Sequence, residues 1–309
     1  MRILLDQPRD YAPFGPVVPT AAVASPGERE LWSGLAGGRT PLAAPAPAGL
    51  DGGFWHAGYA VAEAAGSQYD LLRSLAAAGS LPGGNLFCLA GRGRGFHGQH
   101  GRNWQALAGN LHLSAALAAD LPVPGWGPAL PALPAVAALD AVRRCVGPGP
   151  RLGLKWVNDV LADGAKLGGV LTAVRTRAGR IERIFLGIGL NVAAAPPLPV
   201  DAFVPAVTCL DDLAGPGTDA VAVTMALLEA VQVRFLEFCA HGPGELLRAY
   251  REGSVVIGRR VTVHPDAGSP DGTTGVRTGI VAAIGDDLSL HLAGGGPPVA
   301  QGRLVLEPA

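Results

Sequence analysis

The sequence has little lysine and no excess of charge of either sign. Of its 24 Lys and Arg residues only two are lysines, Lys155 and Lys166, and these lie within twelve residues of each other. The 24 basic residues face 25 acidic ones, so the formal net charge of -1 offers no positive surface for a polyanion. We therefore expect no nucleic-acid binding. Because arginine cannot replace the compact ammonium of lysine, two lysines kept in an arginine-rich chain indicate a site that needs this geometry.

The sequence also lacks metal-binding cysteine motifs and long hydrophobic runs. The four cysteines are far apart, with no C-x-x-C pair and no histidine at metal-ligand spacing, so we interpret them as buried apolar thiols. The longest uncharged stretch, residues 121–139, contains five prolines, each of which would break a membrane helix. The N-terminus lacks the apolar core of a secretory signal. We expect a cytoplasmic protein without a membrane span.

Length and composition favour one large folded domain or two smaller ones. The 309 residues are 49% hydrophobic, and the 45 glycines and 27 prolines show no period that would indicate a repeat protein. We divide the chain into a Pro/Ala/Gly-rich N-terminal extension (1–53), a main domain (54–252) and a C-terminal domain (253–309). The extension is expected to be irregular apart from a helical patch around residues 28–35, and it could pack on the main domain.

Apolar periodicity and turn residues predict mixed strands and helices in the main domain. The expected strands are 59–61, 86–90, 110–115 and 152–157, followed by a hairpin of 166–175 and 180–192. The expected helices are 69–78, 135–146, 221–238 and 244–252. Five short apolar segments between Gly, Asp and Pro turns predict a small all-β module at the C-terminus: 255–257, 260–263, 279–281, 288–290 and 304–306.

A glycine-rich segment, residues 91–101, follows the predicted buried strand at 86–90 and precedes Trp104. Its glycines alternate with arginine and histidine. The backbone N–H groups of such a loop can approach phosphate while the basic side chains supply counter-charge. The alternative is a flexible loop that binds nothing, because glycine-rich loops are common. Trp104 could stack on a ring, although a buried tryptophan is more often part of the core.

Both lysines lie in a second segment, residues 154–171. Two amines, an amide and a carboxylate beside a Gly-Gly pair would suit an anionic substrate with a metal-bound nucleotide. The alternative is a hairpin with solvated charges and a turn at Asp163-Gly164, which explains Asp163 but not Lys155 or Asp159. A third segment, residues 187–192, is apolar except for Asn191, which alone indicates no more than a turn cap.

Taken together, these segments resemble the biotin protein ligase family, part of the biotinyl/lipoyl ligase fold. The family pattern is a G-R-G-R-x-G-R-x-W loop, then G-N-L-x-x-S, K-W-P-N-D with K-L-x-G-I-L, and G-I-G-x-N-V. The matching segments are, in order, Gly101–Trp104, Gly109–Ser114, Lys155–Asp159, Lys166–Leu171 and Gly187–Val192. The resemblance covers residues from about 54 to 306. It implies an α+β catalytic domain, with a mixed, largely antiparallel sheet flanked by helices, and a small SH3-like C-terminal barrel.

The resemblance also implies an activity. Such enzymes activate biotin with ATP and Mg²⁺ to biotinyl-5′-adenylate, release pyrophosphate, and transfer the acyl group to one lysine of a biotin carboxyl carrier domain. By resemblance, Lys166 would hold the biotin carboxylate and the α-phosphate, Asp159 would place Mg²⁺ or orient the amine, and Arg102 would supply charge near the phosphates. The implied nucleotide-binding residues are Trp104, Asn110, Lys155, Asn158 and Asn191. The implied biotin-binding residues are Ser67, Gln68, Gly98, Gln99, His100, Gly101, Gly168 and Gly169.

The glycine-rich segment departs from the family pattern. In a gapless register ending at Trp104, only Gly98, Gly101 and Arg102 of the family loop are retained. The family glutamine that reaches the biotin ureido group falls on Gly93, so the residue that binds this group is left unassigned. A second register uses residues 91–95 as the phosphate loop, with five extra residues before Trp104. The sequence leaves both registers open.

Two other functions fit parts of the pattern. Lipoate and octanoate ligases or transferases of the same fold favour an R-R-x-S-G-G-G loop followed by H-D, whereas Trp104 follows the loop here, which favours biotin. A non-catalytic binding module is suggested by the divergent loop. Lys166 and Asp159 argue against it, because binding alone need not retain a charge placed for a transition state. No helix-turn-helix pattern precedes residue 54, so we expect no operator binding. The carrier protein and the oligomeric state are not predicted.

Overall fold

The computed structural model describes residues 1–7, 18–19, 25–37, 39–45, 47, 50, 53–197, 201–266 and 275–307. A ten-stranded sheet forms the body of the protein, in the strand order β2-β3-β1-β4-β5-β6-β10-β9-β8-β7. Its strands are β1 (Arg2–Leu5), β2 (Val18–Pro19), β3 (Leu42–Pro45), β4 (Trp55–Ala64), β5 (Asn85–Gly93), β6 (Leu111–Pro122), β7 (Leu152–Lys155), β8 (Asp159–Ala162), β9 (Ala165–Arg177) and β10 (Arg180–Leu190). Since only β1–β4 and β4–β5 pair in parallel, the predicted mixed, largely antiparallel sheet is confirmed.

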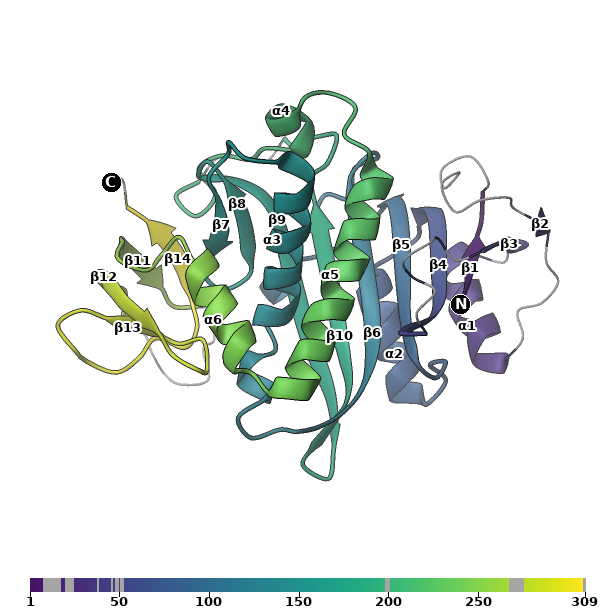
Figure 1. The fold of residues 1–309 in the computed structure, drawn as a ribbon, viewed down its shortest axis with the longest axis horizontal. Coiled ribbons are helices and arrows are strands. Elements are labelled where there is room, and N and C mark those ends of the chain that lie inside the picture. The colour runs from purple at the N-terminus through teal and green to yellow at the C-terminus, as the bar shows by residue number, and fades with distance from the viewer. Residues whose placement is uncertain are drawn as a thin grey trace.

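Helices cover both faces of this sheet. One face carries α3 (Ala132–Val146) and α5 (Ala220–His241) side by side, with α6 (Gly244–Gly253) leading away and the short α4 (Leu210–Ala214) at one end (Figure 1). The other face carries α1 (Pro26–Ala36) and α2 (Gln68–Ala78). Successive side chains of a strand point to opposite faces, so Phe87 packs with the α3/α5 cluster while Cys88 packs under α1 and α2.

The N-terminal residues belong to the large sheet, and the expectation of an irregular extension is wrong for the part that the structure describes. β1 pairs with β3 and, in parallel, with β4, and Ile3 and Leu5 are fully buried. Helix α1 contains the predicted helical patch and begins at a capping box in which Ser25 and Glu28 exchange hydrogen bonds. A four-residue strand has too little periodicity to be recognised alone, and its partners β3 and β4 lie far along the chain.

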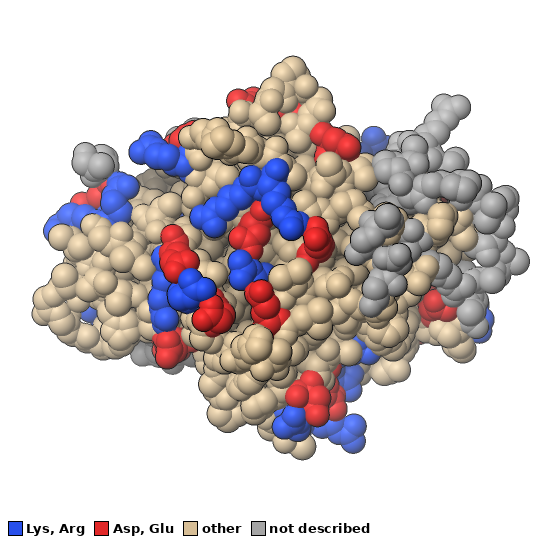
Figure 2. Space-filling view, viewed as in Figure 1, with Lys and Arg blue, Asp and Glu red and all other residues tan. Residues whose placement is uncertain are grey.

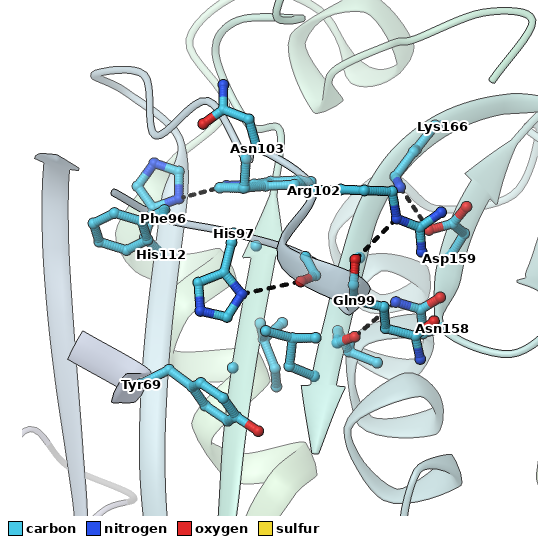
Figure 3. Close-up of a pocket in the computed structure, with 18 of the residues that line it drawn as sticks. Tyr69, Phe96, His97, Gln99, Arg102, Asn103, His112, Asn158, Asp159 and Lys166 are labelled. Atoms are coloured by element: carbon cyan, nitrogen blue, oxygen red, sulfur yellow. Dashed lines mark hydrogen bonds and ion pairs between the residues drawn. The ribbon is translucent and has the colours of Figure 1, made fainter. Parts of the chain in front are cut away.

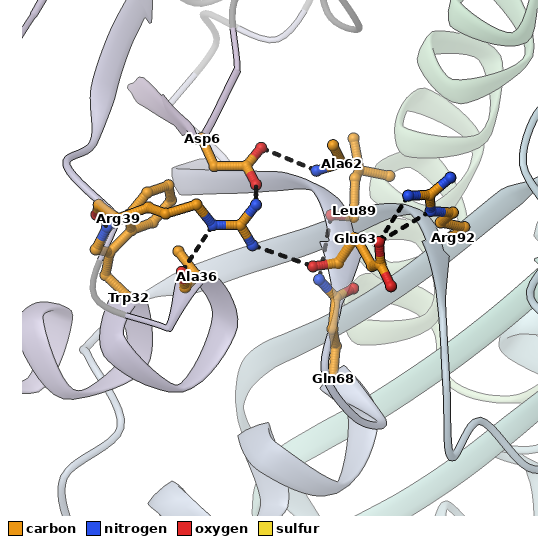
Figure 4. Close-up of polar contacts among 9 residues, drawn as sticks. All are labelled: Asp6, Trp32, Ala36, Arg39, Ala62, Glu63, Gln68, Leu89 and Arg92. Atoms are coloured by element: carbon orange, nitrogen blue, oxygen red, sulfur yellow. Dashed lines mark hydrogen bonds and ion pairs between the residues drawn. The ribbon is translucent and has the colours of Figure 1, made fainter.

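Polar contacts fasten this N-terminal part to the sheet. The Arg39 guanidinium lies 2.5 Å from a carboxylate oxygen of Asp6 and donates to the backbone oxygen of Glu63 at 3.2 Å (Figure 4). The Asp6 carboxylate also accepts the backbone N–H of Ala62 at 2.9 Å. On the neighbouring strand, Arg92 makes two hydrogen bonds to the carboxylate of Glu63. The residues after α1 are thereby tied to β1 and β4.

Most predicted elements are confirmed, with shifted ends. Helix α2 ends at Gly79, which adopts the left-handed conformation (φ 75°) expected of a glycine C-cap. Strands β9 and β10 form the predicted hairpin, whose turn residues are Ala178 and Gly179. Two expectations need correction. Strand β5 extends to Gly93, so the first glycines of the glycine-rich segment lie in the sheet. Residues 255–257 form no strand and contribute one isolated bridge, from Ile257 to Val281.

A four-stranded antiparallel sheet forms the C-terminal unit, consistent with the expected SH3-like module. Its strands are β11 (Arg260–His264), β12 (Arg277–Ile284), β13 (Leu290–Leu292) and β14 (Arg303–Leu306). The indole N–H of Trp156, from the loop between β7 and β8, donates to the backbone oxygen of Leu288 at 2.7 Å. Arg251 of α6 donates to the backbone oxygen of Ile284 at 2.8 Å. These bonds join the unit to the body. Its boundary at residue 253 stays an interpretation.

Charged side chains, helix length and cysteine burial can be compared with the expectations from composition. On the face drawn in Figure 2, acidic and basic side chains are intermixed. No helix among the described residues is long and apolar enough to cross a membrane. All four cysteines are free thiols; Cys88 and Cys209 are buried as expected, whereas Cys145 and Cys239 are only partly buried.

The placement of β1 in the core can be tested through stability. Replacing the fully buried Ile3 by alanine should lower the free energy of unfolding by about 2–5 kcal/mol, because it leaves a cavity between β1 and its neighbours. The matched control is Ile280→Ala, at a side chain that is 46% exposed, where we expect a change within about 0.5 kcal/mol. Urea unfolding measures both. Equal effects would contradict a buried N-terminal strand.

Candidate active site

A pocket lies on the face of the large sheet that carries α2, and glycines form its floor. In the antiparallel register of β9 and β10, Gly169 is directly opposite Gly189. Gly187, two residues before Gly189, points to the same face, where it lies against the ring of Tyr69. Because none of these three positions has a side chain, the rings of Tyr69 and Trp104 pack directly on the floor, and a ligand can approach the backbone at Gly169.

A lysine–carboxylate pair stands at one end of this pocket. Lys166 Nζ lies 2.6 Å from Asp159 Oδ1, and the two side chains are 20% and 16% exposed. Asn158, beside them, donates to the backbone oxygen of Val170 at 2.9 Å. The guanidinium of Arg102 extends from the loop on the opposite side toward the same pair (Figure 3). The pocket therefore has a charged end with two cationic side chains and one carboxylate.

The β8–β9 hairpin brings this pair together. Its turn is Asp163-Gly164, and both residues have positive φ (47° and 85°), the backbone of a two-residue hairpin turn. Asp163 is therefore a turn residue, as the hairpin interpretation of segment 154–171 predicted. The register shifts after Val160, and Asp159 and Lys166 point into the same pocket from the paired strands. Lys155 lies on β7, one strand further along the sheet.

Residues 96–104, which we call the glycine loop, form the wall opposite the Lys166–Asp159 pair. His97 and Asn103 form an antiparallel bridge, and the Gly98 N–H donates to the backbone oxygen of Arg102 at 2.7 Å. The tip is a 3₁₀ turn (Gln99–Gly101) in which His100 has a φ of 55°. The pocket is lined by residues 96–99 and 102–104, while residues 91–93 lie in β5. This placement favours the gapless register.

Trp104 is held at the end of the glycine loop by its close fit to the floor. A Cβ atom on Gly189 would lie 2.4 Å from the Trp104 ring, so the indole packs directly on the glycine backbone. The indole N–H donates to His112 Nδ1 at 3.3 Å. Burial lowers the pKa of His112 to about 4, so the ring is neutral at pH 7, and its Nε2–H donates to the Leu107 oxygen at 3.2 Å. This bond pattern fixes the tautomer that accepts from Trp104.

The structure brings many of the expected site residues into the pocket. Those in the lining are Ser67, Gly98, Gln99, Arg102, Trp104, Asn158, Asp159, Lys166, Gly169 and Asn191. Ser67 also caps α2 by accepting the Asp70 N–H at 3.2 Å. Asn191 is buried and donates to the backbone oxygen of Thr208 at 3.0 Å. These two residues combine a place in the pocket with a structural bond.

Three other expected site residues lie outside the lining and hold its surroundings. Lys155 is buried, which lowers its pKa, and its ammonium donates to the backbone oxygen of Phe203. Asn110 Oδ1 accepts the successive backbone N–H groups of residues 192–194 and so holds the turn after β10. Gln68 is 1% exposed and donates to the Leu89 oxygen at 3.1 Å (Figure 4).

The remaining expected residues belong to the loop tip and the floor edge. His100 is exposed, and its Nε2 lies 3.2 Å from a carboxylate oxygen of Asp266 in the C-terminal unit; Gly101 follows it in the left-handed conformation (φ 71°). Gly168 faces away from the lining, and a Cβ there would lie 2.6 Å from the Gly189 oxygen. None of these three residues lines the pocket; His100 and Gly101 form the tip of the glycine loop, and Gly168 packs against β10.

Sequence reasoning missed other residues that line the pocket. Tyr69 of α2 and Phe96 and His97 of the glycine loop face it. Arg303 reaches it from β14 of the C-terminal unit, with its guanidinium 3.6 Å from the centre of the Phe203 ring and 3.6 Å from an Asp201 oxygen. No motif marks Arg303, which is one of twenty-two arginines.

Comparison with known proteins agrees with this geometry. No known family profile matches the chain. The solved structure of the biotin protein ligase from Aquifex aeolicus in complex with biotin and ATP superposes with a TM-score of 0.61 at 18% identity, covering 82% of this chain and 99% of that one. The biotin protein ligase from Leishmania major in complex with biotin superposes with a TM-score of 0.54 at 17% identity, covering 82% of this chain and 98% of that one. The fold is that of the biotin protein ligases.

Sequence similarity leads to the family. Over 254 residues, 80% of this chain and 87% of the relative, the chain is 35% identical to the biotin--[acetyl-CoA-carboxylase] ligase of Mycobacterium tuberculosis H37Rv. It is 31% identical over 154 residues to the bifunctional ligase/repressor BirA of Bacillus subtilis, covering 50% of this chain and 45% of that protein. The chain belongs to the biotin protein ligase family. The name of the first relative and the titles of both solved structures carry biotin, which favours biotin over the lipoate and octanoate alternatives.

The close contact between Trp104 and the floor can be tested with one methyl group. Gly189→Ala should lower the free energy of unfolding by about 1–3 kcal/mol, because the new Cβ overlaps the indole. Combining it with Trp104→Ala should reduce this effect, since the overlap is then removed. Gly244→Ala is the control, because a Cβ there meets nothing within 4 Å. A Gly189→Ala effect that persists unchanged in the Trp104→Ala background would rule out this contact.

Proposed function

We propose that this chain joins biotin to ATP as biotinyl-5′-adenylate and then transfers the acyl group to a specific lysine of a biotin carrier domain, such as that of acetyl-CoA carboxylase. The observation that carries the proposal is the Lys166–Asp159 pair, 2.6 Å apart beside a glycine floor. It stands in a chain 35% identical to a biotin--[acetyl-CoA-carboxylase] ligase. We also propose a cytoplasmic location, where ATP is available.

In the first step a biotin carboxylate oxygen forms a bond to the α-phosphorus of ATP, and the bond from that phosphorus to the bridging oxygen of pyrophosphate breaks. Negative charge grows on the α-phosphate oxygens and on the leaving group. A fixed ammonium aimed at this position stabilises the transition state more than the bound substrates. Lys166 has this role in our proposal, with Asp159 fixing its direction through the 2.6 Å contact.

The nucleotide would occupy the side of the pocket lined by Trp104, Asn158 and Asn191, with Trp104 against the adenine. Arg102 would add charge near the phosphates, and Arg303 would face the nucleotide from the C-terminal unit. Lys155 and Asn110 would act on the nucleotide indirectly. Lys155 bonds to the 201–207 segment, and Asn110 bonds to the 192–194 turn.

Asp159 is the residue that would hold Mg²⁺. Among the described residues no three His, Cys, Asp or Glu side chains gather to hold a metal ion. Mg²⁺ is commonly bound through one or two carboxylates, with substrate phosphates and water completing its shell, so a single carboxylate beside a nucleotide is sufficient. Bound there, the ion would neutralise phosphate charge.

The biotin end would lie between the α2 N-terminus and the glycine loop. Ser67, Gly98, Gln99 and Gly169 line this part, and the glycine-loop tip (His100, Gly101) with Gln68 and Gly168 supports it from outside. Closure around the mixed anhydride would exclude water until the carrier lysine arrives. The lysine amine then attacks the acyl carbon, the carbon–oxygen bond to phosphate breaks, and AMP leaves.

The role of Lys166 predicts a defect confined to the chemistry. Lys166→Ala should slow adenylate formation by about 10²–10³-fold, because it removes a charge aimed at the transition state. Rapid quench of the purified enzyme with ATP and biotin measures this step. The control is Arg151→Ala, which removes a 90% exposed guanidinium outside the pocket and should change nothing. Wild-type rates in Lys166→Ala would show that the assignment is wrong.

The two half-reactions can be separated. When synthetic biotinyl-5′-adenylate is supplied with a carrier domain, Lys166→Ala should lose much less activity than in adenylate formation, because the bond to the α-phosphorus is already made. An equal loss in both assays would mean that Lys166 maintains the pocket rather than assisting phosphoryl chemistry. Urea unfolding of the variant would then show reduced stability.

A further inference from the structure

His97 links the glycine loop to helix α2 and has no part in the function proposed above. Its Nε2 lies 2.6 Å from Asp70 Oδ2, and its Nδ1 lies 3.0 Å from the backbone oxygen of Gly98. Both partners are acceptors, and a neutral imidazole has a hydrogen on one nitrogen only. Both bonds are satisfied together only by the imidazolium. The ring lines the pocket beside Tyr69, as Figure 3 shows.

The charges around His97 favour this protonated form. The bond to the Gly98 oxygen and the Asp70 carboxylate raise the pKa of His97, against the opposing effects of burial and of Arg73. Arg73 lies 3.5 Å from the other oxygen of Asp70. Tyr69 meets the ring edge-on with centroids 6.4 Å apart, and burial raises its pKa to about 12, so it is neutral. The floor residues Gly187, which contacts the Tyr69 ring, and Leu171 carry no charge.

This contact is one of two histidine–carboxylate contacts that tie the glycine loop to the rest of the described chain. The other joins His100 at the tip to Asp266. The Arg102 side chain bonds within the loop, to the Gln99 oxygen at 2.9 Å. Since His97 precedes Gly98 and bridges to Asn103, a change at His97 reaches both strands of the loop. The position of Gln99 and Arg102 in the pocket therefore depends on where His97 is held.

We propose that His97 is a positioning residue whose imidazolium, bound by Asp70 and the Gly98 oxygen, clasps the glycine loop against α2 and thereby makes binding of the acid substrate depend on pH. The inference rests on the proposed function, because it takes this pocket as the acid-binding site. The sign follows from the bonds. Below the pKa of His97 both bonds are made, and as the pH rises through that pKa one nitrogen loses its proton and one bond is lost.

The expected effect is moderate. The His97 and Asp70 side chains are 28% and 45% exposed, and partly solvated ion pairs contribute little to stability. We therefore expect the dissociation constant for biotin to rise about threefold to tenfold between pH 6 and pH 9. An arginine at position 97 keeps the positive charge at all these pH values, and a glutamine keeps one hydrogen bond without charge.

The experiment combines titration and binding. Nuclear magnetic resonance of the His97 ring protons should give a pKa above the ordinary value of about 6.5, lowered by Asp70→Asn, in the full-length protein. Calorimetry should show that biotin affinity falls with rising pH in the wild type and stays level in His97→Arg. His97→Gln should bind weakly at all pH values. His241→Gln, at an exposed residue in the last turn of α5, is the control and should follow the wild type.

Two results would overturn the clasp: an Asp70→Asn variant with an unchanged His97 pKa, or a His97→Arg variant with the same pH dependence as the wild type. Failure of every variant to bind biotin would contradict the proposed function instead. Hydrogen exchange at residues 98–103 then decides the clasp alone, because it needs no substrate. At one pH, exchange should be several-fold faster in His97→Gln than in His97→Arg, and equal rates would rule the clasp out.

Discussion

The pairing of β9 with β10 is the constraint on which the rest of the site depends. This register sets Gly169 against Gly189 and turns both bare positions to the face that carries α2. A shift of one residue would send these glycines to the α3/α5 face and close the pocket with side chains. Lys166 is the second residue of β9, so the register also determines where its ammonium lies relative to the floor. Two long antiparallel strands thereby define both the shape and the charge of the site.

Segment 154–171 connects the two units as well as supplying side chains to the site. Trp156 bonds to Leu288 of the C-terminal unit, and Lys155 bonds to Phe203 in the segment that faces the pocket. The C-terminal unit in turn supplies Arg303 to the pocket and Asp266 to the tip of the glycine loop. Both units thus contribute residues to the site. We expect a substitution at their junction to change the geometry of the pocket.

Local patterns were sufficient to predict much of the fold. The β9–β10 hairpin and helix α2 with its Gly79 cap carry periodicity and turn residues within one segment. Strand β1 does not, because its burial comes from pairing with β3 and β4, far along the chain. The difference has a physical cause. A turn is encoded by adjacent residues, whereas a short parallel strand depends on distant partners.

For the site, the order of the motifs predicted which residues lie near one another, but it did not predict how each side chain is oriented. Lys166 and Asp159 were expected together and lie 2.6 Å apart. Gln68 was expected to bind substrate but points into the protein, because its position on α2 turns it toward Leu89. His97 was missed because its partner, Asp70, lies on another element. The packing of helices and loops determines which neighbour a side chain contacts, and a sequence motif does not contain this information.

The most direct test of the account is ATP–pyrophosphate exchange by the purified protein with biotin, lipoate, octanoate or no acid, in the presence of Mg²⁺. The account predicts exchange that depends on biotin and stays at the no-acid level with the other two. Such a result would also show that this glycine loop recognises the ureido ring without the family glutamine. Exchange with lipoate or octanoate instead of biotin, or with none of the acids, would contradict the central claim.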